Sequence, residues 1–129
     1  MKLNFTITEL VQSETAKKYG IDNMPYNTQI VDNLLLLILN VLQPLRDYIK
    51  KPIIVNSGFR SVALNAKVGG VANSQHIEGK AADIVIKGMS IPQIMNAVKL
   101  SGITFDQCIN EKTWVHISYN KNKNRRQFL

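Results

Sequence analysis

Both histidines of the chain fall in two short stretches, and the need to bring these stretches together limits the folds that the sequence can adopt. The first stretch, Ser74–Asp83, reads SQHIEGKAAD and contains His76, and the second is Trp114-Val115-His116. Imidazole and carboxylate groups are ligands that Zn²⁺ accepts, and a catalytic zinc commonly keeps three protein ligands and one water. His76, Asp83 and His116 would supply those three ligands. We therefore expect a zinc site where the two stretches meet.

The spacing within the first stretch predicts a turn followed by a strand. His76 and Asp83 are seven residues apart, too far for a paired-histidine motif on one helix, and Gly79 lies between them where the chain can turn. Apart from Asp83, residues 81–86 are apolar and partly β-branched, which is typical of a buried strand. An unpaired charge in such a strand is strongly destabilising, so Asp83 needs a partner, and a metal ion is one.

The second stretch is expected to form a hairpin with the residues before it. Residues 105–111 and 114–119 both have strand character, and Lys112-Thr113 can form a two-residue loop between them. This loop would set three cross-strand pairs: Glu111 with Trp114, Ile109 with His116, and Gln107 with Ser118. Because cross-strand partners share a face, Glu111 should lie on the metal side. Asp106 and Cys108 should face away, which argues against Asp106 as a base and Cys108 as a ligand.

The rest of the chain predicts one domain with a buried helix. The length of 129 residues and the hydrophobic content of 45% suit a single core, and the lone cysteine excludes an intramolecular disulfide. A long helix is expected to begin near Thr28 or Gln29, because apolar residues recur at helical spacing from Ile30 to Tyr48, and Pro44 should kink or divide it. Shorter helices are expected within residues 5–20, 61–68 and 90–100, and a strand at residues 53–55.

These motifs resemble those of the peptidase M15 family. The pattern S-x-H-x-x-G-x-A-x-D followed by W-x-H resembles its zinc D-alanyl-D-alanine carboxypeptidases and dipeptidases and its phage endolysins, which cut L-alanyl-D-glutamate bonds. Asn56–Ser61 is similar to the family's S-G-[Y/F]-R segment, while Asn65, Gly69–Val71 and Phe105–Gln107 resemble its short phage and prophage branch. The resemblance implies one α+β domain over residues 1–129, with a mainly antiparallel central sheet, helices packed around it, and the fold shared with hedgehog signalling domains.

The resemblance also implies roles for individual residues. By resemblance, zinc is bound by three residues, His76, Asp83 and His116. Arg60 and Ser74 hold the substrate, and Trp114 is expected to wall the cleft. A planar, bidentate arginine suits recognition of a substrate carboxylate. Without the resemblance, a surface cation or a structural ion-pair partner is the alternative interpretation of Arg60.

The catalytic base is expected at a position that departs from the family pattern. Many family members carry a carboxylate three residues before the last histidine, but that position here is Thr113, which cannot act as a base. Glu111, five residues before His116, is the nearest carboxylate, and the hairpin places it on the metal side. We expect Glu111 to take the proton of the attacking water. A zinc-binding relative without catalysis stays an alternative.

The charge of the chain favours anionic partners without identifying one. The net charge is +7, and residues 121–126 form a basic tail that we expect to be solvated. Nucleic acid and anionic peptidoglycan would both be attracted, but neither a zinc finger nor an RNA-recognition motif is present. A basic nucleic-acid or phage structural protein is therefore the third alternative. We expect peptidoglycan or its stem peptides as the partner, no specific nucleic acid, and a monomer.

The start of the chain bears on where such an enzyme would act. The sequence begins MKLNFT, without the apolar run of a secretory signal, and polar residues interrupt the apolar run of residues 34–39 at both ends. We expect no transmembrane segment and synthesis in the cytoplasm. The protein would act on the cell wall after its release from the cytoplasm. For a phage or prophage product, a holin would open that route.

Overall fold

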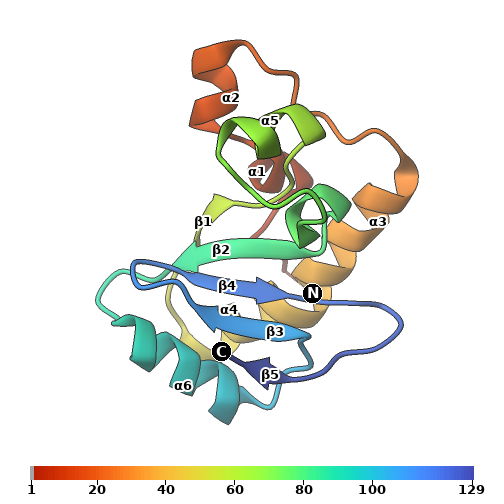
Figure 1. Ribbon diagram of the computed structural model, residues 1–129. Helices are drawn as coiled ribbons and strands as arrows, with labels where there is room; N and C mark the ends of the chain where they lie inside the picture. The colour runs from red at the N-terminus through yellow and green to blue at the C-terminus, as the bar shows by residue number, and fades with distance from the viewer. Residues whose placement is uncertain (1) are drawn as a thin grey trace.

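The computed structural model describes residues 2–129, and a five-stranded sheet lies at its centre (Figure 1). The strands follow the spatial order β1-β2-β4-β3-β5. Their bounds are β1 (Ile54–Ser57), β2 (Ala81–Val85), β3 (Gln107–Asn110), β4 (Val115–Ser118) and β5 (Gln127–Phe128). All neighbours are antiparallel except β3 and β5, which are parallel. The fold is thus a single α+β domain with a mostly antiparallel sheet, as expected.

Helices surround this sheet on several sides. They are α1 (Ile7–Val11), α2 (Glu14–Tyr19), α3 (Thr28–Leu37), α4 (Gln43–Ile49), α5 (Val62–Lys67) and α6 (Ile91–Ser101), with a π-helical turn η1 (Ile38–Leu42) and a 3₁₀ turn η2 (Gln75–Glu78). Side-chain oxygens cap many of them, because the first backbone N–H groups of a helix have no partner within it. The capping residues are Thr6, Ser13, Asn27, Ser61, Ser74 and Ser90. Figure 1 shows α3 and α4 behind the sheet, α6 beside it, and α1, α2 and α5 beyond β1.

The helical run from Thr28 to Ile49 forms much of the core. Its apolar residues include several that are fully buried: Leu34, Leu37, Val41, Leu42 and Leu45. By length and composition this run could cross a membrane, but half of its most apolar window is buried inside the protein, as in a core helix. The absence of a transmembrane segment stays a prediction. The division expected near Pro44 takes the form of the π-helical turn η1, directly before α4.

The predicted hairpin register is confirmed. Ile109 pairs with His116, and the backbone N–H of Glu111 donates to the Trp114 carbonyl over 3.0 Å. Lys112, the first loop residue, has a positive φ of 73°. Glu111 follows the last residue of β3, and continued alternation from this pairing would set it on the face of the sheet that carries His116.

Residues 121–126 are exposed apart from the half-buried Asn124, as expected for a solvated tail, but the end of the chain is also held to the sheet. β5 pairs with β3, and the ring of Phe128 packs edge-on against Phe105 with centroids 5.1 Å apart. Arg125 forms an ion pair with Asp106 at 2.8 Å. The positive charge of residues 121–126 predicted their exposure correctly but did not indicate these contacts with the sheet.

Gly79 links η2 to β2 in a position where a side chain has no room. Its φ is +73°, and a Cβ would lie 2.8 Å from the carbonyl oxygen of Ile30 on α3. Gly102, which ends α6, has an equivalent φ of +72° but no atom within 4 Å of such a Cβ. An alanine at either position would be strained by the positive φ, but only an alanine at Gly79 would also clash with a neighbouring atom.

We predict that Gly79→Ala lowers the free energy of unfolding more than Gly102→Ala does. Both alanines are strained in the left-handed region by about 1 kcal/mol, and the contact with α3 should add at least about 1 kcal/mol at Gly79. Urea denaturation of the two variants measures the difference. Equal losses would show that η2 is not tightly packed on α3.

Candidate metal centre and substrate cleft

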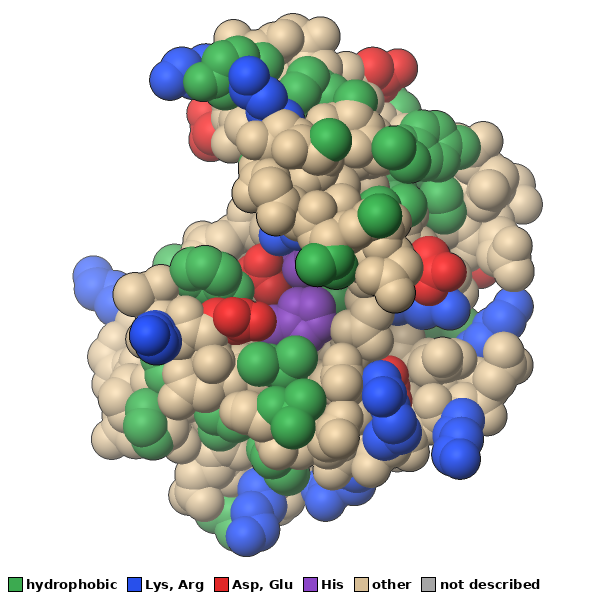
Figure 2. Space-filling model, viewed as in Figure 1, with side chains coloured by type: hydrophobic (Ala, Val, Ile, Leu, Met, Phe, Trp, Pro, Cys, Tyr) green, Lys and Arg blue, Asp and Glu red, His purple; other side chains and the backbone are tan. Residues whose placement is uncertain are grey.

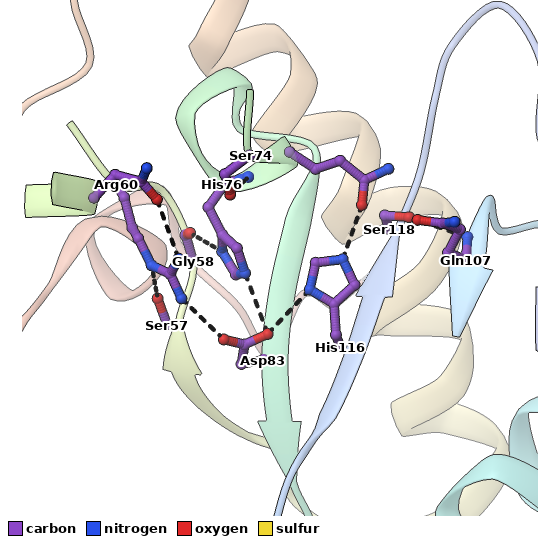
Figure 3. A network of polar contacts seen from close by, with 11 residues as sticks. Ser57, Gly58, Arg60, Ser74, His76, Asp83, Gln107, His116 and Ser118 are labelled. Carbon is purple, nitrogen blue, oxygen red and sulfur yellow. Dashed lines mark hydrogen bonds and ion pairs between the residues drawn. The ribbon is translucent and has the colours of Figure 1, made fainter. Parts of the chain in front are cut away.

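Three side chains from three elements converge on one point. His76 lies on η2, Asp83 on β2 and His116 on β4, where Asp83 and His116 are cross-strand partners. The Oδ1 atom of Asp83 is 3.2 Å from His76 Nε2 and 3.2 Å from His116 Nδ1 (Figure 3). One ligand atom from each residue lies within 4.8 Å of the others. The fold thus brings together the three ligands that the sequence predicts.

The donor set fits a zinc ion. Two ligands about 2.1 Å from a tetrahedral zinc lie about 3.4 Å apart, close to the observed 3.2 Å separations. The remaining nitrogen of each imidazole has an acceptor: His76 Nδ1 lies 2.7 Å from the Gly58 carbonyl, and His116 Nε2 lies 2.8 Å from Gln75 Oε1. With those N–H groups so assigned, the nitrogens that face Asp83 are free to bind a cation.

Asp83 is a buried anion. Its side chain is only 7% exposed. Burial raises the pKa of the carboxyl group, but the contacts with His116 and His76 outweigh burial and hold the pKa well below its usual range. A bound cation would lie between Asp83 Oδ1 and the two imidazole nitrogens that now contact it.

The end of β1 is fitted closely around His76. The carbonyl of Gly58 accepts from the His76 ring, and the backbone N–H of Arg60 donates to the His76 carbonyl over 3.1 Å. A Cβ on Gly58 would lie 2.3 Å from the carbonyl oxygen of Leu10, so only glycine allows this approach to α1. The S-G-F-R segment therefore supports the metal site through its backbone.

The guanidinium of Arg60 reaches the site from the same segment. Its Nη2 lies 3.3 Å from Asp83 Oδ2, while Nε and Nη1 donate to Ser57 and Asn65 over 3.1 and 3.3 Å. Sequence reasoning did not foresee the contact with Asp83. Because a guanidinium has five N–H donors, two remain for another acceptor.

A cleft of about 470 Å³ opens beside the metal centre. Its lining comes from α2, the end of β1, α5 and the hairpin, and comprises Ser13, Glu14, Thr15, Asn56, Ser57, Arg60, Leu64, Val68, Asp83 and Trp114. Figure 2 shows histidine atoms at the bottom of a hollow, with acidic side chains beside them. Trp114 is 36% exposed at the wall. The cleft is therefore large enough for several atoms of a peptide next to the ligands.

Glu111 and Ser74 occupy different surroundings. Glu111 is exposed at the tip of the hairpin, between β3 and β4. Ser74 is buried, and its Oγ accepts from the backbone N–H of His76 over 3.2 Å, which caps η2. The structure thus gives Ser74 a local role in holding His76. The substrate and catalytic roles expected for Glu111, Ser74, Arg60 and Trp114 stay predictions.

The predicted orientation of Asp106 is wrong. Asp106 precedes β3, so strand alternation does not govern its side chain, and its Oδ2 lies 3.2 Å from Gln75 Nε2. The Arg125 guanidinium, hydrogen-bonded to this carboxylate, lowers the pKa of Asp106 against the opposing effect of burial. Sequence reasoning missed Gln75 and Arg125. The only signals were the position of Gln75 directly before His76 and the position of Arg125 in the basic tail.

Comparison with known proteins agrees with this site. The family model described as Peptidase M15 matches residues 3–118. The chain belongs to the peptidase M15 family. Over 54 residues, it is 44% identical to the zinc D-Ala-D-Ala carboxypeptidase of Streptomyces albus G, a match that spans 42% of this chain and only 21% of that relative's length.

A solved structure also aligns with this chain. It is the crystal structure of the L-Ala D-Glu endopeptidase ChiX of Serratia marcescens, with 20% sequence identity and a TM-score of 0.47. The alignment covers 78% of this chain and 92% of that chain.

The ion pair of Asp106 predicts a pH-dependent stability. Because its folded pKa is lowered, ionised Asp106 stabilises the fold above about pH 4, and the contribution is lost as the pH falls through the folded pKa. In metal-free protein, Asp106→Asn should lower the free energy of unfolding at pH 7, and the gap to wild type should narrow towards pH 2. Denaturant titrations over this range test it, with Asp32→Asn at an exposed position of α3 as the charge control. A gap that does not change with pH would contradict the assignment.

Proposed function

We propose that this protein is a zinc-dependent peptidase that hydrolyses peptide bonds in peptidoglycan stem peptides, with the cell wall as its site of action. The observation that carries the proposal is the convergence of His76 Nε2, Asp83 Oδ1 and His116 Nδ1 beside the cleft. Membership of the M15 family supports it, as does the similarity to a zinc D-Ala-D-Ala carboxypeptidase. A carboxypeptidase would cleave the terminal D-Ala-D-Ala bond of the stem peptide. An endopeptidase would cleave a bond inside the stem peptide.

The proposed mechanism uses one general base. Zinc held by His76, Asp83 and His116 would acidify a water molecule and polarise the scissile carbonyl. Glu111 takes the proton of the attacking water and returns it to the leaving amine. Its place on the hairpin that carries His116 supports this role, and the exposed hairpin tip gives the carboxylate freedom to reach the substrate.

Arg60 and Trp114 are proposed to position the substrate. The two unused N–H groups of Arg60 would bind a substrate carboxylate, and Trp114 would pack against the peptide on the opposite wall. Asp83 offsets the charge of Arg60 through their 3.3 Å contact, so the guanidinium is stable when no substrate is bound. Ser74 would help to hold His76 in place by accepting from its backbone N–H, and it would bond any substrate group within reach of its hydroxyl.

A second candidate function is a zinc-binding module without catalysis. The observation that favours it is Thr113, which stands where many family members carry the basic carboxylate. Such a module would hold zinc through the same three ligands and bind the wall without cutting it. Zinc content and hydrolysis must therefore be measured on the same samples.

Glu111→Gln is expected to keep zinc and to lower kcat by about 10² to 10⁴, because a general base contributes about that factor. His76→Ala should lose both zinc and activity. The assay is release of amino groups from purified peptidoglycan and from synthetic stem peptides, with zinc measured in each sample. Glu78→Gln, a matched glutamate on η2, is the control and should stay active.

The outcomes separate the two candidates. Full activity of Glu111→Gln would show that Glu111 is not the base. Wild-type protein that holds zinc but releases nothing from any substrate would support the binding module. Cleavage by wild type would identify the bond through the products.

Arg60→Lys tests recognition of a substrate carboxylate. Lysine keeps the positive charge beside Asp83 but loses the planar pair of donors. We expect wild type to have a lower KM for a stem peptide with a free terminal carboxylate than for its amidated form. In the variant, the ratio of these two KM values should fall by about tenfold. Unchanged zinc content serves as the control. An unchanged preference would leave Arg60 as a purely structural partner of Asp83.

A further inference from the structure

A chain of polar side chains connects His116 to the C-terminal tail. His116 Nε2 lies 2.8 Å from Gln75 Oε1, and Gln75 Nε2 donates to Asp106 Oδ2 over 3.2 Å. Arg125 then binds Asp106 with two N–H groups, Nε to Oδ1 and Nη2 to Oδ2, each over 2.8 Å. The chain thus begins at a candidate metal ligand on β4 and ends at a residue just before β5.

The chain fixes the orientation of the Gln75 amide. An amide presents an acceptor oxygen at one end and donor N–H groups at the other. The anionic carboxylate of Asp106 accepts only, so the NH₂ group of Gln75 must face it and the oxygen must face His116. A flipped amide would set its oxygen against the carboxylate and its N–H groups against the imidazole N–H.

The amide orientation in turn selects the tautomer of His116. Because Gln75 Oε1 accepts a hydrogen bond, Nε2 of His116 carries the proton, and Nδ1 is left to face Asp83 and a metal ion. The same contact holds the plane of the ring. His76 receives the equivalent support from the Gly58 carbonyl, so each imidazole has one acceptor behind it.

The anchor of this chain lies in the tail. Asp106 is only 2% exposed, and besides the guanidinium it accepts from the backbone N–H of Arg125 over 3.0 Å. The backbone N–H of Gln127 donates to the Asp106 carbonyl over 2.9 Å. The family model matches residues 3–118, so Asp106 lies inside the matched region and its tail partners Arg125 and Gln127 lie outside it.

We propose that Gln75, Asp106 and Arg125 are positioning residues that hold His116 with Nδ1 towards the metal, so that the C-terminal tail contributes to metal affinity. The proposal rests on the zinc site of the proposed function. None of the three residues touches the metal or the substrate. Their effect passes through the orientation and tautomer of His116.

Zinc dissociation constants test the proposal without any substrate. They can be measured by competition with a chromophoric chelator on the full-length protein. Loss of a group that supports a metal ligand typically weakens binding by about 10- to 100-fold, and we expect Gln75→Ala to fall in this range. Arg125→Ala should weaken binding by about tenfold, the lower end of that range. Arg126→Ala is the matched control, because it removes the same charge from the next residue, which donates to the carbonyls of Ile103 and Lys99 instead.

The double variant Gln75→Ala/Arg125→Ala separates this role from general stability. If Arg125 acts through Gln75, its loss should weaken zinc binding no further once Gln75 is absent. The visible absorption spectrum of the Co²⁺-loaded protein should change in Gln75→Ala and Arg125→Ala and stay as in wild type in Arg126→Ala. Thermal unfolding of the metal-free variants reports their stability separately.

Several results would overturn the proposal. One is equal weakening by Arg125→Ala and Arg126→Ala, and another is an Arg125→Ala effect that persists in full without Gln75. Failure of hydrolysis would contradict the proposed function but leave these affinities interpretable. Wild-type protein that binds no zinc would overturn both proposals.

Discussion

The buried carboxylate of Asp83 is the constraint on which the site depends. It lies on β2 near the centre of the sheet, where an uncompensated charge would be strongly destabilising. Three separate segments each bring a partner to it: Arg60 from the end of β1, His76 from η2 and His116 from β4. One anion therefore fixes both the geometry of the candidate metal centre and the packing of the elements around it.

Close backbone approach makes that convergence possible. Gly58 lets the end of β1 lie against α1, and Gly79 lets η2 lie against α3. The β1 segment and η2 are then joined by the bond from Arg60 N–H to the His76 carbonyl and by the bond from the His76 ring to the Gly58 carbonyl. The glycines of the motifs thus act on the metal site through the position of His76.

Some features of the site could be predicted from sequence and others could not. The three ligands and the pairing of Ile109 with His116 follow from residue chemistry, the family motif and strand alternation, which are local signals. The orientation of Asp106 could not be predicted, because alternation does not apply before the strand begins. Nor could its pairing with Arg125, since a contact across 19 residues leaves no pattern in either segment.

X-ray absorption at the zinc edge tests the central claim most directly. It reports the atoms bound to zinc in the purified protein. The account predicts only nitrogen and oxygen ligands at about 2.0–2.2 Å, with scattering from two imidazole rings. The cysteine Cys108 is buried and its pKa is raised to about 12, so it should remain a thiol. A sulfur ligand at about 2.3 Å, a single imidazole, or no bound zinc would contradict the account.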